Sequence, residues 1–264
     1  MFAIYRRLWQ VNWAEQWQYR ADLLLFLTGW LISPIIFMAV WTTVASAQGN
    51  VNGITAPEFA AYYLVLLLVT IATSDTTLNS LSYKIMGGGL SYQLVVPVHP
   101  VLTQMLVNNL ASKALQMAAL TPIWLILYLL FHPALAITPT NMLLALPAIT
   151  MGFLLQFLAN ATITCLAFWT TRGGSIMSLY GTIFSFLSGQ IVPLTLLPLF
   201  AQNAAAVLPF RLALYFPVQL ILGTFTVEET LINLGLQLIW CLVLLVVFNL
   251  VWRAGLKRYS AVGA

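Results

Sequence analysis

Residues 230–252 read TLINLGLQLIWCLVLLVVFNLVW and contain no charged side chain. The hydrocarbon core of a bilayer is about 30 Å thick, and a helix needs about 20 apolar residues to cross it. This run is therefore long enough to span a membrane. Similar apolar segments lie near 23–47, 59–82, 111–131, 142–170 and 176–198. The sequence therefore predicts an all-α integral membrane protein with six transmembrane helices.

The composition of the whole chain supports this fold class. Of the 264 residues, 61% are hydrophobic and 6% are charged, whereas an ordinary soluble domain carries about 25% charged residues. A mean hydropathy of +0.95 leaves too few polar side chains to cover a soluble surface. The ten basic residues are spread along the chain and form no patch for nucleic acid. Cys165 and Cys241 lie inside apolar runs, where we interpret them as small hydrophobic side chains.

The positions of the basic residues predict how the six helices are oriented. With a cytosolic N-terminus and six spans, every Lys and Arg except Arg211 falls on the cytosolic side. A seventh span through residues 200–225 would move three C-terminal basic residues outside, so the positive-inside rule favours six spans and cytosolic termini. The prolines from Pro193 to Pro217 then predict an extracytoplasmic re-entrant helical hairpin at 199–228, before the last span.

The first residues predict a helix that lies on the membrane. In residues 1–22, Tyr5, Trp9, Trp13 and Trp17 recur at helical spacing, and such aromatic rings prefer the membrane interface. This interfacial helix serves either as an anchor or as a moving elbow against a partner. No soluble domain interrupts the chain, so we expect a single transmembrane domain over 1–264 and any energy-consuming domain on another chain.

The stretch KIMGGGLSYQLVVPVHP, residues 84–100, contains three consecutive glycines. It lacks the lysine and hydroxyl of the phosphate-binding motif G-x-x-x-x-G-K-[ST], so we exclude a nucleotide site there. We expect instead that Gly87 ends the second span in a left-handed conformation. Leu90, Leu94 and Val98 recur every four residues and predict the apolar stripe of a short cytosolic helix.

The sequence shows no arrangement of residues for covalent or metal chemistry. His99 and His132 are expected on opposite sides of the membrane, so they cannot share a metal ion. No nucleophile accompanied by a base is apparent. We therefore predict that the chain is not an enzyme and has no catalytic, cofactor-binding or metal-binding residues of its own.

Asp75 is the only acidic residue expected inside a span, where an ionisable group costs about 2.5–3.5 kcal/mol. Lys113 begins the third span on the same side of the membrane. The aspartate could form a structural pair with Lys113, line a polar substrate path, or relay protons. Gln190 and other polar residues of the fourth and fifth spans could line such a path or form interhelical hydrogen bonds. We keep Asp75, Lys113 and Gln190 as candidates for a translocation path or an intramembrane pair.

Several motifs on this topology resemble the ABC-2 type permease family. The segment GGLSYQLVVPVHP (88–100) lies between the second and third spans, and SGQIVPLTLLPLF (188–200) opens the proline-rich hairpin. The C-terminal FPVQLILG (216–223) and WRAGLKRYSAVG (252–263) are similar to a branch of short six-span bacterial permeases, often encoded as two related membrane subunits beside an ATPase.

This resemblance implies a permease subunit of an ATP-driven exporter in the bacterial cytoplasmic (inner) membrane. Its partners would be membrane lipids, a second permease subunit, identical or related, and cytosolic ABC ATPase subunits that bind ATP and Mg. The cytosolic segment 84–100 would couple the permease to the ATPase, through Gly89, Leu90, Tyr92, Gln93, Leu94, Val95, Pro97 and Val98. The alternative is a self-sufficient secondary transporter or channel, although the sequence shows neither paired inverted repeats nor several intramembrane carboxylates.

Overall fold

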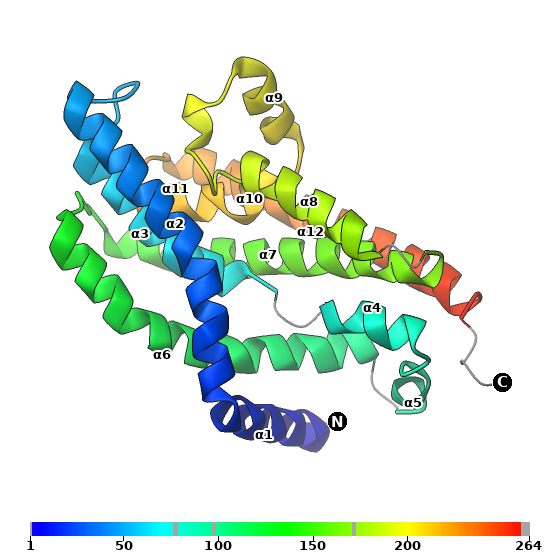
Figure 1. Ribbon diagram of the computed structural model, residues 1–264. Helices are drawn as coiled ribbons and strands as arrows, with labels where there is room; N and C mark the ends of the chain where they lie inside the picture. The colour runs from blue at the N-terminus through cyan, green and yellow to red at the C-terminus, as the bar shows by residue number, and fades with distance from the viewer. Residues whose placement is uncertain (1, 76–78, 97–98, 171–172, 260–264) are drawn as a thin grey trace.

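The computed structural model describes residues 2–75, 79–96, 99–170 and 173–259 (Figure 1). Helices dominate these residues, and their only β pairing is a bridge between Val51 and Ile54. Five helical stretches are long and apolar enough to cross a membrane: Leu31–Gln48, Ala56–Thr73, Ser112–Phe131, Pro139–Phe168 and Val227–Leu256. The prediction of an all-α, multi-pass membrane protein is therefore confirmed, with five candidate spans in place of six.

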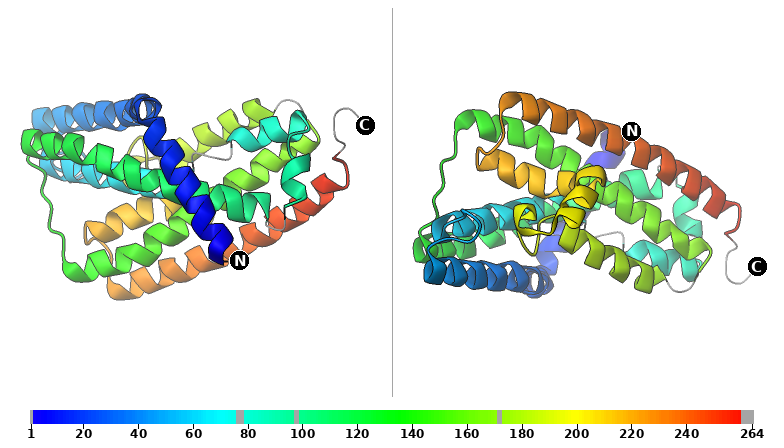
Figure 2. Two further views of the ribbon diagram at one scale, coloured as in Figure 1. Left: turned by 90° about the horizontal axis from the view of Figure 1, so that it is seen from below. Right: turned by 90° about the horizontal axis from the view of Figure 1, so that it is seen from above.

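The long helices alternate in direction (Figures 1 and 2). Three run one way: α3 (Ala56–Thr73), α7 (Pro139–Thr164) and α12 (Val227–Leu256). Three run the opposite way: α2 (Arg20–Gln48), α6 (Leu106–Phe131) and α8 (Gly173–Leu187). The molecule therefore has two ends, one with the starts of α3, α7 and α12, and one with the C-terminus.

A threonine caps the start of each helix in the first set. Thr226 Oγ1 accepts a hydrogen bond from the Glu229 N–H at 3.2 Å, and the Glu229 carboxylate accepts one from the Thr226 N–H at 2.8 Å. Thr55 and Glu58 form the same capping box before α3, and the Thr138 hydroxyl caps α7. These caps satisfy N–H groups that a helix leaves without partners. The three helices therefore begin at one polar end of the molecule.

The core is built around α3 and α7. α7 packs against α3, α8 and α12, and also against the short helices α10 (Phe210–Ala213) and α11 (Tyr215–Ile221). A Cβ on Gly152 of α7 would lie only 2.6 Å from the Ala213 carbonyl oxygen, so glycine permits this close approach. Most side chains of α3 are buried, including the fully buried Phe59 and Tyr63. α3 is therefore shielded by the helices around it.

The predicted fifth span, 176–198, is longer than the helix in the structure. α8 ends at Leu187, and Gly189 follows with a φ of 82°. A 3-10 turn (Leu194–Leu196) and α9 (Leu199–Val207) then lead into α10 and α11. The region before the last span therefore consists of short helices, as its prolines predict, but α10 and α11 pack against the core.

The predicted second span, 59–82, is interrupted. α3 ends at Thr73, Ser74 is extended with φ −62° and ψ 150°, and α4 begins only at Asn79 and ends at Met86. The hydroxyls of Thr73 and Ser74 bond back to carbonyl oxygens of α3, a local interaction that competes with helix continuation. Asp75 therefore follows the end of a helix, and its predicted place inside a continuous span is wrong.

The predicted N-terminal helix is present as α1 (Phe2–Gln18), and α2 begins at Arg20. α1 lies across α6 (Figure 2). Trp9, Trp13 and Trp17 are exposed, and the rings of Trp9 and Trp13 stack at 6.4 Å. The side chain of Tyr5 lies outside the described part of the chain. The exposed tryptophans leave an aromatic face available for the membrane interface.

Candidate functional site

The glycine-rich stretch forms a turn between two short helices. α4 ends at Met86, and the four-residue α5 (Ser91–Leu94) follows. Gly88 adopts the left-handed conformation, with a φ of 76°, so the prediction that Gly87 does so is wrong by one residue. The Leu90 N–H donates to the Lys84 carbonyl oxygen at 3.0 Å and closes the turn. This geometry is typical of a glycine-capped helix end.

Leu90 anchors this segment to the rest of the chain. Its side chain is completely buried in a cluster with Ile85, Phe157, Phe248 and others. The prediction that Leu90 belongs to an exposed apolar stripe is therefore wrong, because the Gly88 turn folds it inward.

Leu94 of the predicted stripe is exposed, together with two neighbouring apolar side chains. Tyr92, Leu94 and Val95 are exposed, and Val95 is 84% exposed. Gly89 is half-buried and Gln93 is buried. The predicted contact residues Pro97 and Val98 lie outside the described residues. The structure therefore presents Tyr92, Leu94 and Val95, here called the α5 patch, on the surface near the C-terminal end of α12 (Figure 1).

Two residues near the α5 patch contact α12 and the residues that follow it. The hydroxyls of Ser91 and Tyr259 lie 2.9 Å apart and share a hydrogen bond. The His99 ring packs against Trp252 of α12 at 5.1 Å. Its Nδ1 accepts from the N–H groups of Val101 and Leu102 at 3.2 and 3.1 Å, which caps the helical turn at Pro100–Met105. Burial lowers the pKa of His99 below its ordinary value, which favours the neutral imidazole that this cap requires.

The segment that breaks α3 is bound by two side chains of α6. Lys113 Nζ donates to the carbonyl oxygens of Ser74 and, at 2.9 Å, of Ile71. Asn109 donates to the Asp75 carboxylate. The two bonds from Lys113 satisfy carbonyl groups that the end of α3 leaves without an intrahelical partner. Lys113 therefore donates its hydrogen bonds to backbone carbonyl groups close to Asp75.

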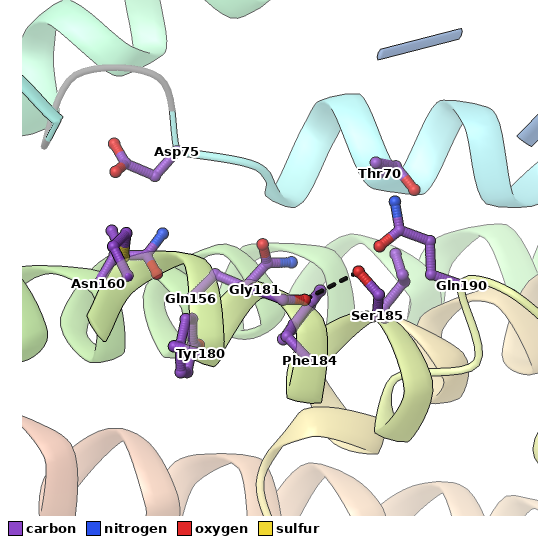
Figure 3. Close-up of a pocket in the computed structure, with 11 residues that line it drawn as sticks. Thr70, Asp75, Gln156, Asn160, Tyr180, Gly181, Phe184, Ser185 and Gln190 are labelled. Carbon is purple, nitrogen blue, oxygen red and sulfur yellow. Dashed lines mark hydrogen bonds between the residues drawn. The ribbon is translucent and has the colours of Figure 1, made fainter. Parts of the chain in front are cut away.

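A pocket of about 260 Å³ opens between the end of α3 and helices α7 and α8 (Figure 3). Asp75 and Gln190 both line it, so two of the three predicted path residues meet there, whereas Lys113 is not among the lining residues. Gln156 and Asn160 reach it from α7, and Ser185 from α8. The lining residues also include Thr70, Met177, Tyr180, Gly181, Phe184 and Leu214. The pocket is therefore lined by both apolar and polar side chains, and the polar ones come from α3, α7 and α8 and from the segments that follow α3 and α8.

The side chains of the pocket differ in their hydrogen bonds. Gln156 Nε2 donates to Thr73 Oγ1 at 2.8 Å, which ties α7 to α3. Ser185 donates to the Gly181 carbonyl within its own helix at 2.8 Å. The Thr70 hydroxyl is buried and has no hydrogen-bond partner among the described residues. The bond between Gln156 and Thr73 is therefore an interhelical hydrogen bond at the pocket, as expected for polar residues of these helices.

Three aromatic residues that no local sequence pattern indicates hold the residues on either side of Gln190. The Tyr62 hydroxyl donates to the Gly189 carbonyl, and the Tyr63 hydroxyl donates to the Ile191 carbonyl, both at 2.6 Å. Trp41 Nε1 also donates to Ile191 at 3.3 Å. Tyr62 and Tyr63 are adjacent in an apolar run, and their partners lie more than 120 residues away, so no local pattern reveals the contact.

The described residues contain no group of three or more His, Cys, Asp or Glu side chains that could hold a metal ion. Cys165 and Cys241 are buried free thiols in separate parts of the core. The pocket and the α5 patch therefore remain as the candidate functional sites.

Together the helices, the pocket and the exposed patch define a multi-pass helical membrane protein with polar groups inside its bundle. The sequence profile of ABC-2 family transporter proteins matches residues 27–263, and the chain therefore belongs to this family of ABC transporter membrane proteins. The predicted family is confirmed. Neither the curated proteins nor the solved structures give a match to the chain.

Proposed function

We propose that the chain is the permease subunit of an ATP-driven exporter, and that a separate cytosolic ABC ATPase binds the α5 patch. The observation that carries this proposal is the exposure of Tyr92, Leu94 and Val95 on a segment whose other side is anchored by Leu90. A rigidly held apolar patch beside a membrane domain suits a protein interface, where a few central residues supply most of the binding energy. ATP and Mg bind the ATPase, and this chain performs no covalent chemistry.

The proposed topology has six crossings with both termini in the cytosol. α7 and α12 run in the same direction, so the chain between them must return once to the end where α12 begins (Figure 1). α8 and the short helices α9, α10 and α11 make this return. α8 alone is about 22 Å long at 1.5 Å per residue, which is shorter than the hydrocarbon core. The short helices therefore form the re-entrant hairpin at 199–228, and a C-terminal reporter is expected on the cytosolic side.

Assembly with partners follows from the proposed function. Two permease subunits, identical or related, form the path in the inner membrane of a bacterium, and each contributes one pocket lined by Asp75 and Gln190. The α1 helix lies at the cytosolic interface with its tryptophans among the lipids. ATP binding moves the α5 patch, and the bond between Ser91 and Tyr259 transmits this movement to α12.

Co-purification tests this function. The permease, tagged at its N-terminus, is expressed with the ATPase of its own transporter and isolated in detergent. We expect the two chains to elute together and the complex to hydrolyse ATP at a rate that differs from that of the ATPase alone. A self-sufficient transporter or channel would elute without the ATPase and leave its hydrolysis rate unchanged, which would refute the proposal.

A further inference from the structure

Among the described residues that line the pocket between α3, α7 and α8, one is charged. Asp75 is that residue, and the side chains of Gln156, Asn160 and Gln190 contribute three amides. In Figure 3, Asp75 lies toward one end of the pocket and Thr70 and Gln190 toward the other, while the amide side chains reach toward the space between them. A ligand in the pocket would therefore meet a carboxylate at one end and hydrogen-bonding groups along its length.

The electrostatic balance at the Asp75 end favours a cation. The nearby ammonium of Lys113 donates to the carbonyl oxygens of Ile71 and Ser74 and does not line the pocket. The C-terminal end of an α-helix carries about half a negative charge, and α3 ends here at Thr73. Asp75 therefore presents a carboxylate to the pocket beside a helix end of the same sign. A carboxylate in this position attracts a positively charged ligand.

The other end of the pocket has an unsatisfied hydroxyl. Thr70 is 7% exposed, and its Oγ1 has no hydrogen-bond partner among the described residues. A buried hydroxyl without a partner costs about 1–3 kcal/mol. This cost is recovered when a ligand hydroxyl or water bonds to Thr70. Amides such as Gln190 both donate and accept, and so they match the hydroxyl groups of a polyol.

We propose that this pocket binds an amine that carries several hydroxyl groups, as in an amino sugar. The protonated amine lies against Asp75, and the hydroxyls bond to the amides of Gln156 and Gln190 and to Thr70. The assignment of such an amine as transported cargo rests on the proposed permease function. Binding itself does not, because the pocket belongs to this chain alone.

Three probes of related shape test the proposal with the full-length chain in lipid nanodiscs. N-methyl-D-glucamine is a protonated amine with five hydroxyls, sorbitol lacks the amine, and N-methylhexylamine lacks the hydroxyls. Binding is measured by saturation-transfer NMR, with empty nanodiscs subtracted to remove partitioning into lipid. We expect N-methyl-D-glucamine to bind at least about tenfold more tightly than either of the other probes. Sorbitol lacks the charged hydrogen bond to Asp75, and N-methylhexylamine lacks the hydrogen bonds of the hydroxyls.

Two substitutions then locate the site. Asp75→Asn is expected to reduce the affinity for N-methyl-D-glucamine to that for sorbitol, and to leave sorbitol binding within about twofold. Thr70→Val keeps the side-chain shape. It is expected to lower the affinity for N-methyl-D-glucamine about fivefold and to leave the affinity for N-methylhexylamine unchanged. If Asp75→Asn does not fold, the preference of the unmodified chain and the Thr70→Val result still decide the matter.

Equal binding of N-methyl-D-glucamine and sorbitol by the unmodified chain would overturn the proposal, as would unchanged binding in both variants. Either result would leave the permease function intact, because association with the ATPase is measured separately. Conversely, selective binding of N-methyl-D-glucamine by a chain that recruits no ATPase would support the binding site and refute the permease function.

Discussion

Lys113 Nζ donates a hydrogen bond to the carbonyl oxygen of Ser74, directly beyond the last residue of α3. A second bond, to Ile71, completes the contact at 2.9 Å. The lysine also lies 4.8 Å from the centre of the Phe153 ring. Lys113 therefore caps a helix that ends inside the protein, and it thereby positions Asp75 at the pocket.

Replacement of Lys113 tests this capping role. Lys113→Met keeps most of the side-chain volume but removes the lysine donor from the Ser74 and Ile71 carbonyl groups, of which Ile71 keeps the Ser74 hydroxyl as a donor. We expect the free energy of unfolding in detergent to fall by on the order of 2 kcal/mol, since hydrogen bonds from charged groups contribute about that much. Lys257→Met, at the exposed end of α12, serves as the control and should change little. Equal unfolding curves for the two variants would argue against the cap.

Gly189 is expected to tolerate no side chain. Its φ is 82°, and a Cβ there would lie 2.7 Å from the Tyr62 hydroxyl and 2.8 Å from Tyr215 Cδ2. Gly189→Ala should therefore lower the yield of folded protein and its melting temperature. Gly235→Ala is the matched control, because nothing lies within 4 Å of its added methyl group and alanine favours a helix by up to about 1 kcal/mol. If both variants melt like the unmodified chain, the packing around Gly189 is not as tight as described.

The cap formed by His99 predicts a dependence on pH. Burial lowers the pKa of this imidazole below the ordinary value of about 6.5. The neutral ring therefore stabilises the segment fully above pH 6.5, and this contribution is lost as the pH falls through the lowered pKa. Hydrogen exchange of the Val101 and Leu102 amides should accelerate below pH 6.5, beyond the intrinsic effect of pH on exchange.

His99→Asn provides the control for this pH dependence. Asparagine caps helices well and does not titrate in this range, so protection of the same amides should become independent of pH once intrinsic rates are corrected. Protection that decreases equally in both proteins would show that another group is responsible.

The sequence predicted the features that depend on composition and local spacing. Apolar runs located the five candidate spans, and the prolines from Pro193 to Pro217 predicted a region of short helices. The exact backbone conformations could not be predicted from the sequence, because they depend on partners that are distant in the chain. Lys113 stabilises the break at Ser74 from α6, and no property of residues 59–82 alone specifies that partner.

The candidate site was predicted only in part, because some of its features also depend on residues distant in the chain. Asp75 was identified as the one acidic residue expected inside a span and Gln190 as a polar residue of the fifth span, and the structure places both in one pocket. Thr70 lies in the apolar helix α3, where a single threonine is unremarkable, and its role depends on the pocket beside it. Leu90 and Leu94 share a four-residue spacing, but the left-handed Gly88 turns one inward and leaves the other exposed.

The central claim is that the α5 patch binds the ATPase. Leu94→Asp and Val95→Asp each place a carboxylate where the partner would bury an apolar side chain, which costs several kcal/mol when the charge has no partner. Val227→Asp is the matched control. It introduces the same group at the exposed first position of α12, at the opposite end of the molecule, where an acidic residue is tolerated.

The most direct measurement is the amount of ATPase that co-purifies with each variant at equal permease yield. Leu94→Asp and Val95→Asp are predicted to retain less than about a tenth of the ATPase bound by the unmodified chain, because a loss of 1.4 kcal/mol already corresponds to a factor of ten. Val227→Asp is predicted to retain all of it. Recovery of the ATPase by Leu94→Asp and Val95→Asp at the level of Val227→Asp would contradict the account.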